Sequence, residues 1–268
     1  YGTIGTGGAL HLENVRLATA TLGSVDGYAL YTKTTLVTMK NVEIDGYSGA
    51  SGQTGGGAMR IRSAVYSGQH TGNPTLINVR VTNCCRGFRI QDSINVYVKD
   101  CTATDVTDNG FYFASGSYTS SSGCTDSTFD SCTATNAGQT AFMNIGGSGN
   151  NFLNIIADGS RGAGFYNWNS NSVTTVTGAV FTNANNAFTV TPWGGNTDDA
   201  NGAAIGQSVE AGDAYSELVL TNIIVNSGGV AGGGSAPQDG PASIVFYNSG
   251  PGSITVNPAF SYTPANFP

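Results

Sequence analysis

Two segments of the chain, DCTATDVTDNGFYF at residues 100–113 and SCTATNAGQTAFMNI at residues 131–145, have nearly the same order of residue types. Each places Cys-Thr-Ala-Thr after a polar residue, continues with a polar turn residue, and has a small residue directly before a phenylalanine. Cys101 and Cys132 are 31 positions apart (132 − 101), and the sequence between the segments shows no such likeness. A repeat of this length is typical of proteins in which one structural unit stacks on the next.

The hydrophobic spacing of these segments recurs through most of the chain. Copies of the pattern begin 22 to 44 residues apart, which indicates a coil of constant size that carries loops of different length. Ile254–Val256 fits the start of a further copy. The eight copies are Leu12–Val15–Leu17, Met39–Val42–Ile44, Leu76–Val79–Val81, Val98–Cys101–Ala103, Phe129–Cys132–Ala134, Phe152–Ile155–Ala157, Val176–Ala179–Phe181 and Leu220–Ile223–Val225.

Each copy predicts short β-strands joined by tight turns. Alternating apolar residues indicate strands, and the three-residue step within the pattern marks a bend between two of them. A polar residue that tolerates left-handed backbone follows the second strand, at Asn83, Asp105, Asn136 and Asn183. A third strand comes next, with inward side chains such as Tyr28/Leu30, Met59/Ile61, Phe88/Ile90 and Phe111/Phe113. Three strands per coil with the same inward positions predict an all-β parallel solenoid.

This pattern resembles the right-handed parallel β-helix superfamily of pectate lyases, polysaccharide epimerases and phage tailspikes. The likeness covers roughly residues 9–256, and it implies a single-stranded right-handed β-helix of about 8–9 coils. We assign residues 1–256 to this domain, and we expect residues 257–268 to form a tail that packs on the solenoid or on a neighbouring subunit. The superfamily hosts several activities, so the resemblance predicts the fold and leaves the function open.

Composition restricts the partners and the environment. The net charge of −7 argues against nucleic acid or an anionic membrane surface as partner. The sequence has no apolar run of 18 residues, so we expect no membrane insertion. A lysine-poor, acidic chain rich in glycine, serine, threonine and asparagine suits an extracellular protein or a virion surface. The five cysteines lack metal-ligand spacing, and we expect Cys101 and Cys132 to be buried thiols at inward strand positions.

Function should come from the outward positions of the third strand, which form two rows along the solenoid. Adjacent coils would bring three arginines together and then place aromatic side chains beyond them, at a spacing of about 4.8 Å per coil. Arginine binds carboxylates and exposed aromatic rings stack on sugars, so the rows predict a groove for an anionic polysaccharide. The alternative is a solvated sheet face with incidental arginines. The first row is Ala29, Arg60, Arg89, Tyr112, Met143, Tyr166 and Thr189, and the second is Tyr31, Arg62, Gln91, Ala114, Ile145, Trp168 and Thr191.

The predicted substrate-binding residues are members of these rows, namely Arg60, Arg62, Arg89, Gln91, Tyr112, Tyr166 and Trp168. The resemblance to lyases implies a group that neutralises a uronate and a base near its C5 proton, and the weak catalytic candidates are Arg89, Tyr66, His70 and Asp92. We expect no cofactor or metal: calcium accompanies some members of the superfamily, but no tight carboxylate cluster is evident here. NTDD at 196–199 and RIR at 60–62 occur in the wrong order for a polygalacturonase, and we reject that assignment.

A third outward row runs along the second strand. It reads Arg16, Glu43, Arg80, Thr102, Thr133, Ile156, Val180 and Ile224, so that it begins polar and ends aliphatic. An exposed aliphatic stripe is typical of an interface. We expect it to pack in a homotrimer or to lie under the C-terminal tail.

These observations favour an extracellular or virion β-helix that binds polysaccharide in the manner of a tailspike, with degradation left open. One alternative is a secreted lyase or epimerase that acts on an acidic glycan. Another is a structural or adhesin solenoid of a surface filament or tail without catalysis.

Overall fold

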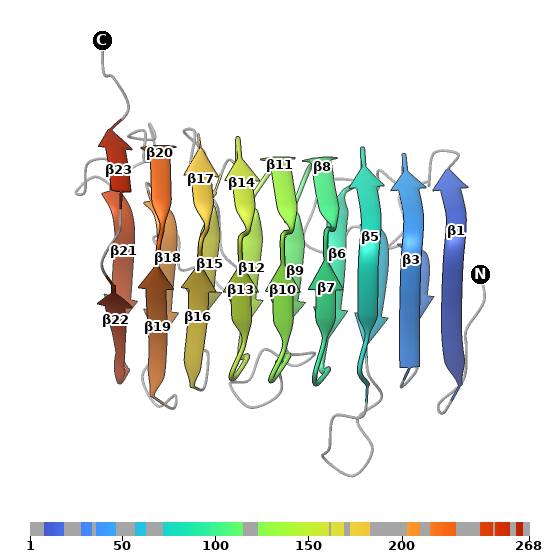
Figure 1. The fold of residues 1–268 in the computed structure, drawn as a ribbon, viewed down its shortest axis with the longest axis horizontal. Coiled ribbons are helices and arrows are strands. Elements are labelled where there is room, and N and C mark those ends of the chain that lie inside the picture. Colours follow the sequence, from blue (N-terminus) through green and yellow to red (C-terminus); the bar gives the residue numbers. More distant parts are fainter. Residues whose placement is uncertain are drawn as a thin grey trace.

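The computed structural model describes residues 8–18, 28–33, 36–46, 57–62, 72–114, 123–160, 162–168, 172–182, 203–209, 215–228, 242–248, 250–257 and 261–264. These residues form 23 strands in two sheets, and every strand pair is parallel (Figure 1). Within this part of the chain, nothing resembles an apolar helix of the length needed to cross a membrane. The predicted parallel solenoid is confirmed.

The larger sheet has fifteen strands and contains the first two strand positions of each coil. In the first three coils one long strand covers both positions, in β1 (Ala9–Ala18), β3 (Leu36–Asp45) and β5 (Thr75–Thr82). In the later coils two shorter strands take the place of this long strand. These pairs are β7 (Tyr97–Lys99) and β8 (Thr102–Val106), β10 (Thr128–Asp130) and β11 (Thr133–Ala137), β13 (Asn151–Leu153) and β14 (Ile156–Asp158), β16 (Val173–Thr177) and β17 (Val180–Thr182), β19 (Ser216–Thr221) and β20 (Ile224–Gly228), and β22 (Gly252–Val256) and β23 (Ser261–Pro264). A ninth coil, formed by β22 and β23, follows the eight coils that the sequence pattern predicted.

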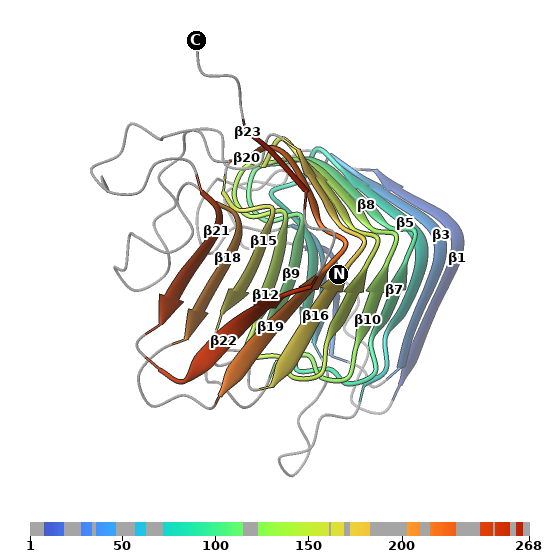
Figure 2. The same ribbon diagram turned by 60° about the vertical axis from the view of Figure 1, so that its left-hand side comes forward.

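The smaller sheet has eight strands, one from each of the first eight coils, and lies across the core from the larger sheet (Figure 2). Its strands follow the order of the coils, and each connection between neighbours crosses over through the larger sheet, so neighbouring coils are always neighbouring strands. The strands are β2 (Tyr28–Thr32), β4 (Gly57–Arg62), β6 (Arg86–Gln91), β9 (Phe111–Ala114), β12 (Phe142–Ile145), β15 (Phe165–Trp168), β18 (Ala203–Val209) and β21 (Ala242–Asn248).

The predicted polar turn column lies at the corner after the second strand. Asn83, Asp105 and Asn136 each have a φ of 53°, the left-handed conformation that asparagine and aspartate tolerate better than other side chains. The amide Nδ2 of Asn136 donates to Oδ1 of Asp105 at 2.8 Å, so the side chains also bond from coil to coil. Asn183, the fourth predicted member, lies outside the described residues.

A second column lies at the three-residue bend, where the sequence predicted a bend but no particular residue. Asn14, Asn41 and Asn78 have φ values of 54°, 52° and 50° inside β1, β3 and β5. Asn78 donates to Asn41 at 2.8 Å, and Asn41 donates to Asn14 at 2.9 Å. The ladder turns the chain within one strand in these three coils, and left-handed residues also occupy the bend in later coils, at Asp100, Ser131 and Asn154.

The core is a stack of identical positions. The rings of Phe88, Phe111 and Phe142 lie 4.5 and 4.7 Å apart between centroids and are within 5° of parallel. All five cysteines lie in the described part of the chain as buried reduced thiols, as expected for Cys101 and Cys132. Burial raises the pKa of the Cys124 thiol to about 12.

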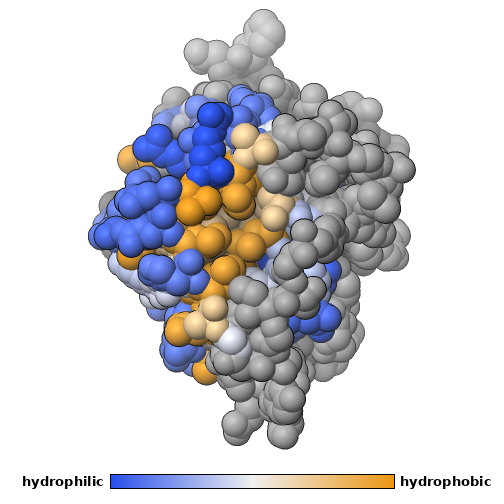
Figure 3. All heavy atoms as spheres, turned by 90° about the vertical axis from the view of Figure 1, so that its right-hand side faces the viewer, coloured by the Kyte–Doolittle hydropathy of each residue, from blue (hydrophilic) through white to orange (hydrophobic). Residues whose placement is uncertain are grey.

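The N-terminal end of the solenoid presents part of this core. Leu10, Leu12, Leu17 and Leu30 pack on the core cluster and are only partly buried. Apolar side chains gather at the centre of that end and hydrophilic ones border them (Figure 3).

The aliphatic row predicted on the second strand is present in register. Ile156 and Ile224 are 42 % and 41 % exposed, and Val180 lies between them in the sheet. Residues 261–264 of the expected tail form β23, which pairs with β20 and places Ser261 beside Ile224. This strand extends the row within the sheet, so it does not cover the row from outside.

Candidate functional site

The outer face of the eight-stranded sheet holds both predicted rows of side chains. Strand register places Tyr31, Arg60, Arg89, Tyr112, Met143 and Tyr166 in one line. In the second line it places Gln91 between Arg62 and Ala114, and Ile145 beside Trp168. All the predicted binding residues therefore lie on one continuous face.

Two parts of the predicted rows are wrong. In β2, Leu30 pairs with Met59 and Tyr31 pairs with Arg60, so Tyr31 takes the place in the first row that was expected for Ala29. The backbone slips by two residues, which keeps the same side chains on each face. At the other end, Tyr166 and Trp168 pair with Gly206 and Ser208 of β18 instead of Thr189 and Thr191.

Arg86, at the start of β6, is a member of the site that the sequence did not indicate. Its guanidinium forms an ion pair with Asp108, and the two side chains are only 4 % and 5 % exposed. Burial disfavours the charged form of Arg86, but the Asp108 carboxylate outweighs this cost, so the pKa of Arg86 is raised. The guanidinium also lies 5.1 Å from the ring centroid of Tyr112.

Asp92, a weak catalytic candidate, serves as the partner of Arg62. Nε of Arg62 donates to Oδ2 of Asp92 at 2.9 Å, with the side chains 34 % and 2 % exposed. Asp92 has a φ of 50°, so it also forms the turn at the end of β6. The ion pair and the turn give Asp92 a role in orienting Arg62.

Arg60 and Arg89 have neutral partners. Nε of Arg60 donates to Oε1 of Gln91 at 2.8 Å, and Nη1 of Arg89 donates to the hydroxyl of Tyr28 at 2.9 Å. The Arg60 guanidinium lies 5.4 Å from the ring centroid of Tyr31, and that of Arg89 lies 5.4 Å from Tyr112. The pKa of Arg60 is lowered, first by burial and then by the positive charge of Arg89.

The aromatic part of the face is more closed than the sequence suggested. Tyr112 and Tyr166 are only 5 % and 4 % exposed, so the expectation of exposed rings at these two positions is wrong. Met143 and Trp168 pack against the two buried clusters that contain these tyrosines, and both are themselves partly buried. Trp168 is therefore the aromatic residue of this part that presents accessible surface.

The other catalytic candidates cannot be placed beside these residues. Tyr66 and His70 lie outside the described residues, as do Asp198 and Asp199. Among the residues that the structure describes, no group of three His, Cys, Asp or Glu side chains could hold a metal ion.

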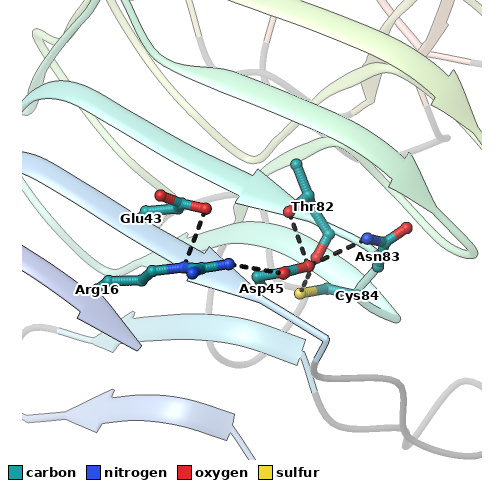
Figure 4. A network of polar contacts seen from close by, with 6 residues as sticks. All are labelled: Arg16, Glu43, Asp45, Thr82, Asn83 and Cys84. Carbon is teal, nitrogen blue, oxygen red and sulfur yellow. Dashed lines mark hydrogen bonds and ion pairs between the residues drawn. The ribbon is translucent and has the colours of Figure 1, made fainter. Parts of the chain in front are cut away.

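A separate network of polar contacts joins side chains of β1, β3 and β5 in the larger sheet (Figure 4). Arg16 forms ion pairs with Glu43 at 3.2 Å and with Asp45 at 3.4 Å. Asp45 also accepts hydrogen bonds of 3.0 Å from Thr82 and Asn83, and these lower its pKa. These contacts join three successive coils, so the polar start of the third outward row has a structural role.

A comparison with protein families identifies the fold. Residues 5–181 match the family described as the right handed beta helix region. The chain belongs to this family. Its right-handed parallel β-helix also continues past the matched region, through β18 to β23.

No curated protein matches the chain. Two similar solved structures are the catalytic domain of a GH87 alpha-1,3-glucanase in complex with tetrasaccharides and the Agl-KA catalytic domain. They are 12 % and 13 % identical, with TM-scores of 0.33 and 0.31, over 92 % and 97 % of this chain. The match covers 63 % and 62 % of the lengths of those two structures, so this chain spans less than two thirds of either one.

Proposed function

We propose that this β-helix binds a polysaccharide along the outer face of its eight-stranded sheet. The observation that supports the proposal is the continuous line of arginines and aromatic side chains from Tyr31 to Trp168. Partly exposed arginines and a partly exposed tryptophan are the side chains that hydrogen-bond and stack on sugars. A chain of sugars lying along the solenoid axis would contact the partly exposed side chains of the two rows, which are Tyr31, Arg60, Arg62, Met143 and Trp168.

The proposed setting is an extracellular or virion surface, where the protein recognises glycan in the manner of a tailspike. The aliphatic row at Ile156, Val180 and Ile224 supports assembly as a homotrimer, since exposed aliphatic stripes commonly pack between subunits. Among the described residues, the carboxylates of the site, Asp92 and Asp108, are both held by arginines, and adhesion without cleavage is therefore proposed first. Lyase or epimerase chemistry would draw on Tyr66 or His70, which lie outside the described residues.

Affinity electrophoresis against a panel of immobilised acidic and neutral polysaccharides tests binding. The expected result is retardation by at least one glycan and weaker retardation of a Trp168→Ala variant. Tyr215→Ala is the matched control, because Tyr215 is a 53 % exposed aromatic beside the other sheet. Equal retardation of both variants would place recognition elsewhere, and no retardation by any glycan would favour a structural solenoid.

The same panel separates binding from degradation. Reducing ends without new ultraviolet absorbance would indicate hydrolysis, whereas absorbance of an unsaturated product would indicate a lyase. The proposal of an adhesin predicts neither signal with the glycan that is bound.

A further inference from the structure

The arginine cluster on β4 and β6 carries more positive charge than its surroundings balance. The cluster consists of Arg60, Arg62, Arg86 and Arg89, four of the seven arginines of the chain. Asp92 is paired with Arg62, and Asp108 with Arg86. Arg60 and Arg89 form no ion pair with a carboxylate among the described residues, so their two positive charges are not balanced within that part of the chain.

Several donors of these two arginines have no acceptor among the residues that the structure describes. Arg89 is only 8 % exposed, and its buried Nε has no hydrogen-bond partner in the described part of the chain. Its Nη1 is occupied by Tyr28. Arg60 donates through Nε to Gln91, and its two terminal amino groups donate to no other described residue. Unsatisfied donors on a buried charged group are costly, so their presence points to an external acceptor.

The two guanidinium groups come from paired positions. Arg60 and Arg89 are partners in the parallel register of β4 and β6, so their Cα atoms are about 4.8 Å apart. Like charges at this distance repel each other, consistent with the lowered pKa of Arg60. The neighbouring segments 47–56, 63–71 and 115–122 contain no aspartate or glutamate, and the segment before β2, 19–27, contains one, Asp26.

The composition of the cluster restricts the ligand. Two arginine forks can each donate two hydrogen bonds to the oxygens of one anion. The hydroxyl of Tyr28 accepts from Arg89 and keeps its own proton, which it can donate to the same ligand. Arg60 and Tyr31 are partly exposed, so the ligand can approach from the Arg60 side.

We infer that Arg60 and Arg89 form a binding site for one oxyanion, the carboxylate or sulfate ester of an acidic sugar residue. The assignment to a sugar rests on the proposed polysaccharide binding, whereas the oxyanion site itself does not. A free inorganic sulfate or phosphate offers the same chemistry and serves as the probe.

The test is a thermal-unfolding titration of the protein with sodium sulfate at constant ionic strength. The variants are Arg60→Gln and Arg89→Gln, and Arg80→Gln is the matched control because Arg80 lies in the same coil on the other sheet. The wild type and the control should show a saturable rise in melting temperature. Each cluster variant should bind sulfate about 10- to 100-fold more weakly, as expected for the loss of charged hydrogen bonds. Without sulfate, Arg89→Gln should be at least as stable as the wild type, because it removes a repelling charge.

An acidic oligosaccharide and a neutral one of the same backbone then identify the source of the anion. Competition with sulfate by the acidic oligosaccharide alone supports the full inference. Saturable sulfate binding that no acidic oligosaccharide displaces supports the oxyanion site and contradicts its assignment to a sugar. The same melting shift in all four proteins would be a general salt effect and would overturn the site. In that case, a neutral glycan bound equally by wild type and Arg60→Gln would still leave the proposed function standing.

Discussion

Neutralising the carboxylate of Asp108 tests how strongly the arginine cluster depends on its buried counterions. The Asp108→Asn change leaves Arg86 charged at a position where its side chain is 4 % exposed. The other charged group at the Tyr112 ring is the guanidinium of Arg89, which is also positive. It cannot replace the negative charge that the substitution removes. Removing one partner of a buried ion pair costs about 3–5 kcal/mol, and we expect the free energy of unfolding to fall by this amount.

Urea unfolding followed by tryptophan fluorescence measures the loss. Asp92→Asn is the matched control, because it removes the same charge from an ion pair whose arginine is 34 % exposed and can be rehydrated. That variant should lose about 1 kcal/mol. A double variant, Arg86→Met with Asp108→Asn, should regain most of the stability because no bare charge stays buried. Equal losses for Asp108→Asn and Asp92→Asn would refute the argument from burial.

Three further predictions concern the coil corners, the polar network and the thiols. Asn136→Ala should destabilise the protein by about 1–2 kcal/mol more than Asn136→Gly in urea unfolding, because a left-handed φ strains alanine and does not strain glycine. Equal losses of stability would contradict this explanation. Asp45 has a pKa below its ordinary value of 3.8, so its stabilising effect is complete above that pH and lost as the pH falls through the folded-state pKa. The stability difference between wild type and Asp45→Asn should therefore vanish in acid, and a constant difference would contradict the assignment. Cys124, whose pKa is raised to about 12 by burial, should resist iodoacetamide in the native protein at mildly alkaline pH and react on unfolding, as read by mass spectrometry; rapid native labelling would show that the thiol is accessible.

The sequence was sufficient for the coil pattern because the inward positions repeat. Phe88, Phe111 and Phe142 stack at one position, and any wrong alignment of these coils would break the stack. The first coil lacked this constraint. In β2, Tyr-Ala-Leu-Tyr alternates in the same way after a shift of two residues, so the sequence could not distinguish Tyr28 from Leu30 as the partner of Met59.

Other features depend on contacts between coils that no local pattern reveals. The ion pair of Arg86 joins the start of β6 to a turn residue of the next coil, Asp108, 22 positions along the chain. The burial of Tyr112 depends on Arg86, Arg89 and the side chains of the following coils. The expected partners of Tyr166 and Trp168 were Thr189 and Thr191, whereas the structure pairs them with β18. The segment 183–202, which precedes β18, contains no copy of the repeat, so no pattern marked where that strand begins.

Hydroxyl-radical footprinting, with and without the best-retained polysaccharide, tests the proposed binding face most directly. It reports the accessibility of individual side chains, and Tyr31 and Trp168 are the partly exposed aromatics at the two ends of the face. Bound polysaccharide should reduce oxidation of both several-fold and leave Tyr215, beside the other sheet, unchanged. Bound polysaccharide that protects Tyr215, or that leaves Tyr31 and Trp168 fully reactive, would contradict recognition on the eight-stranded sheet.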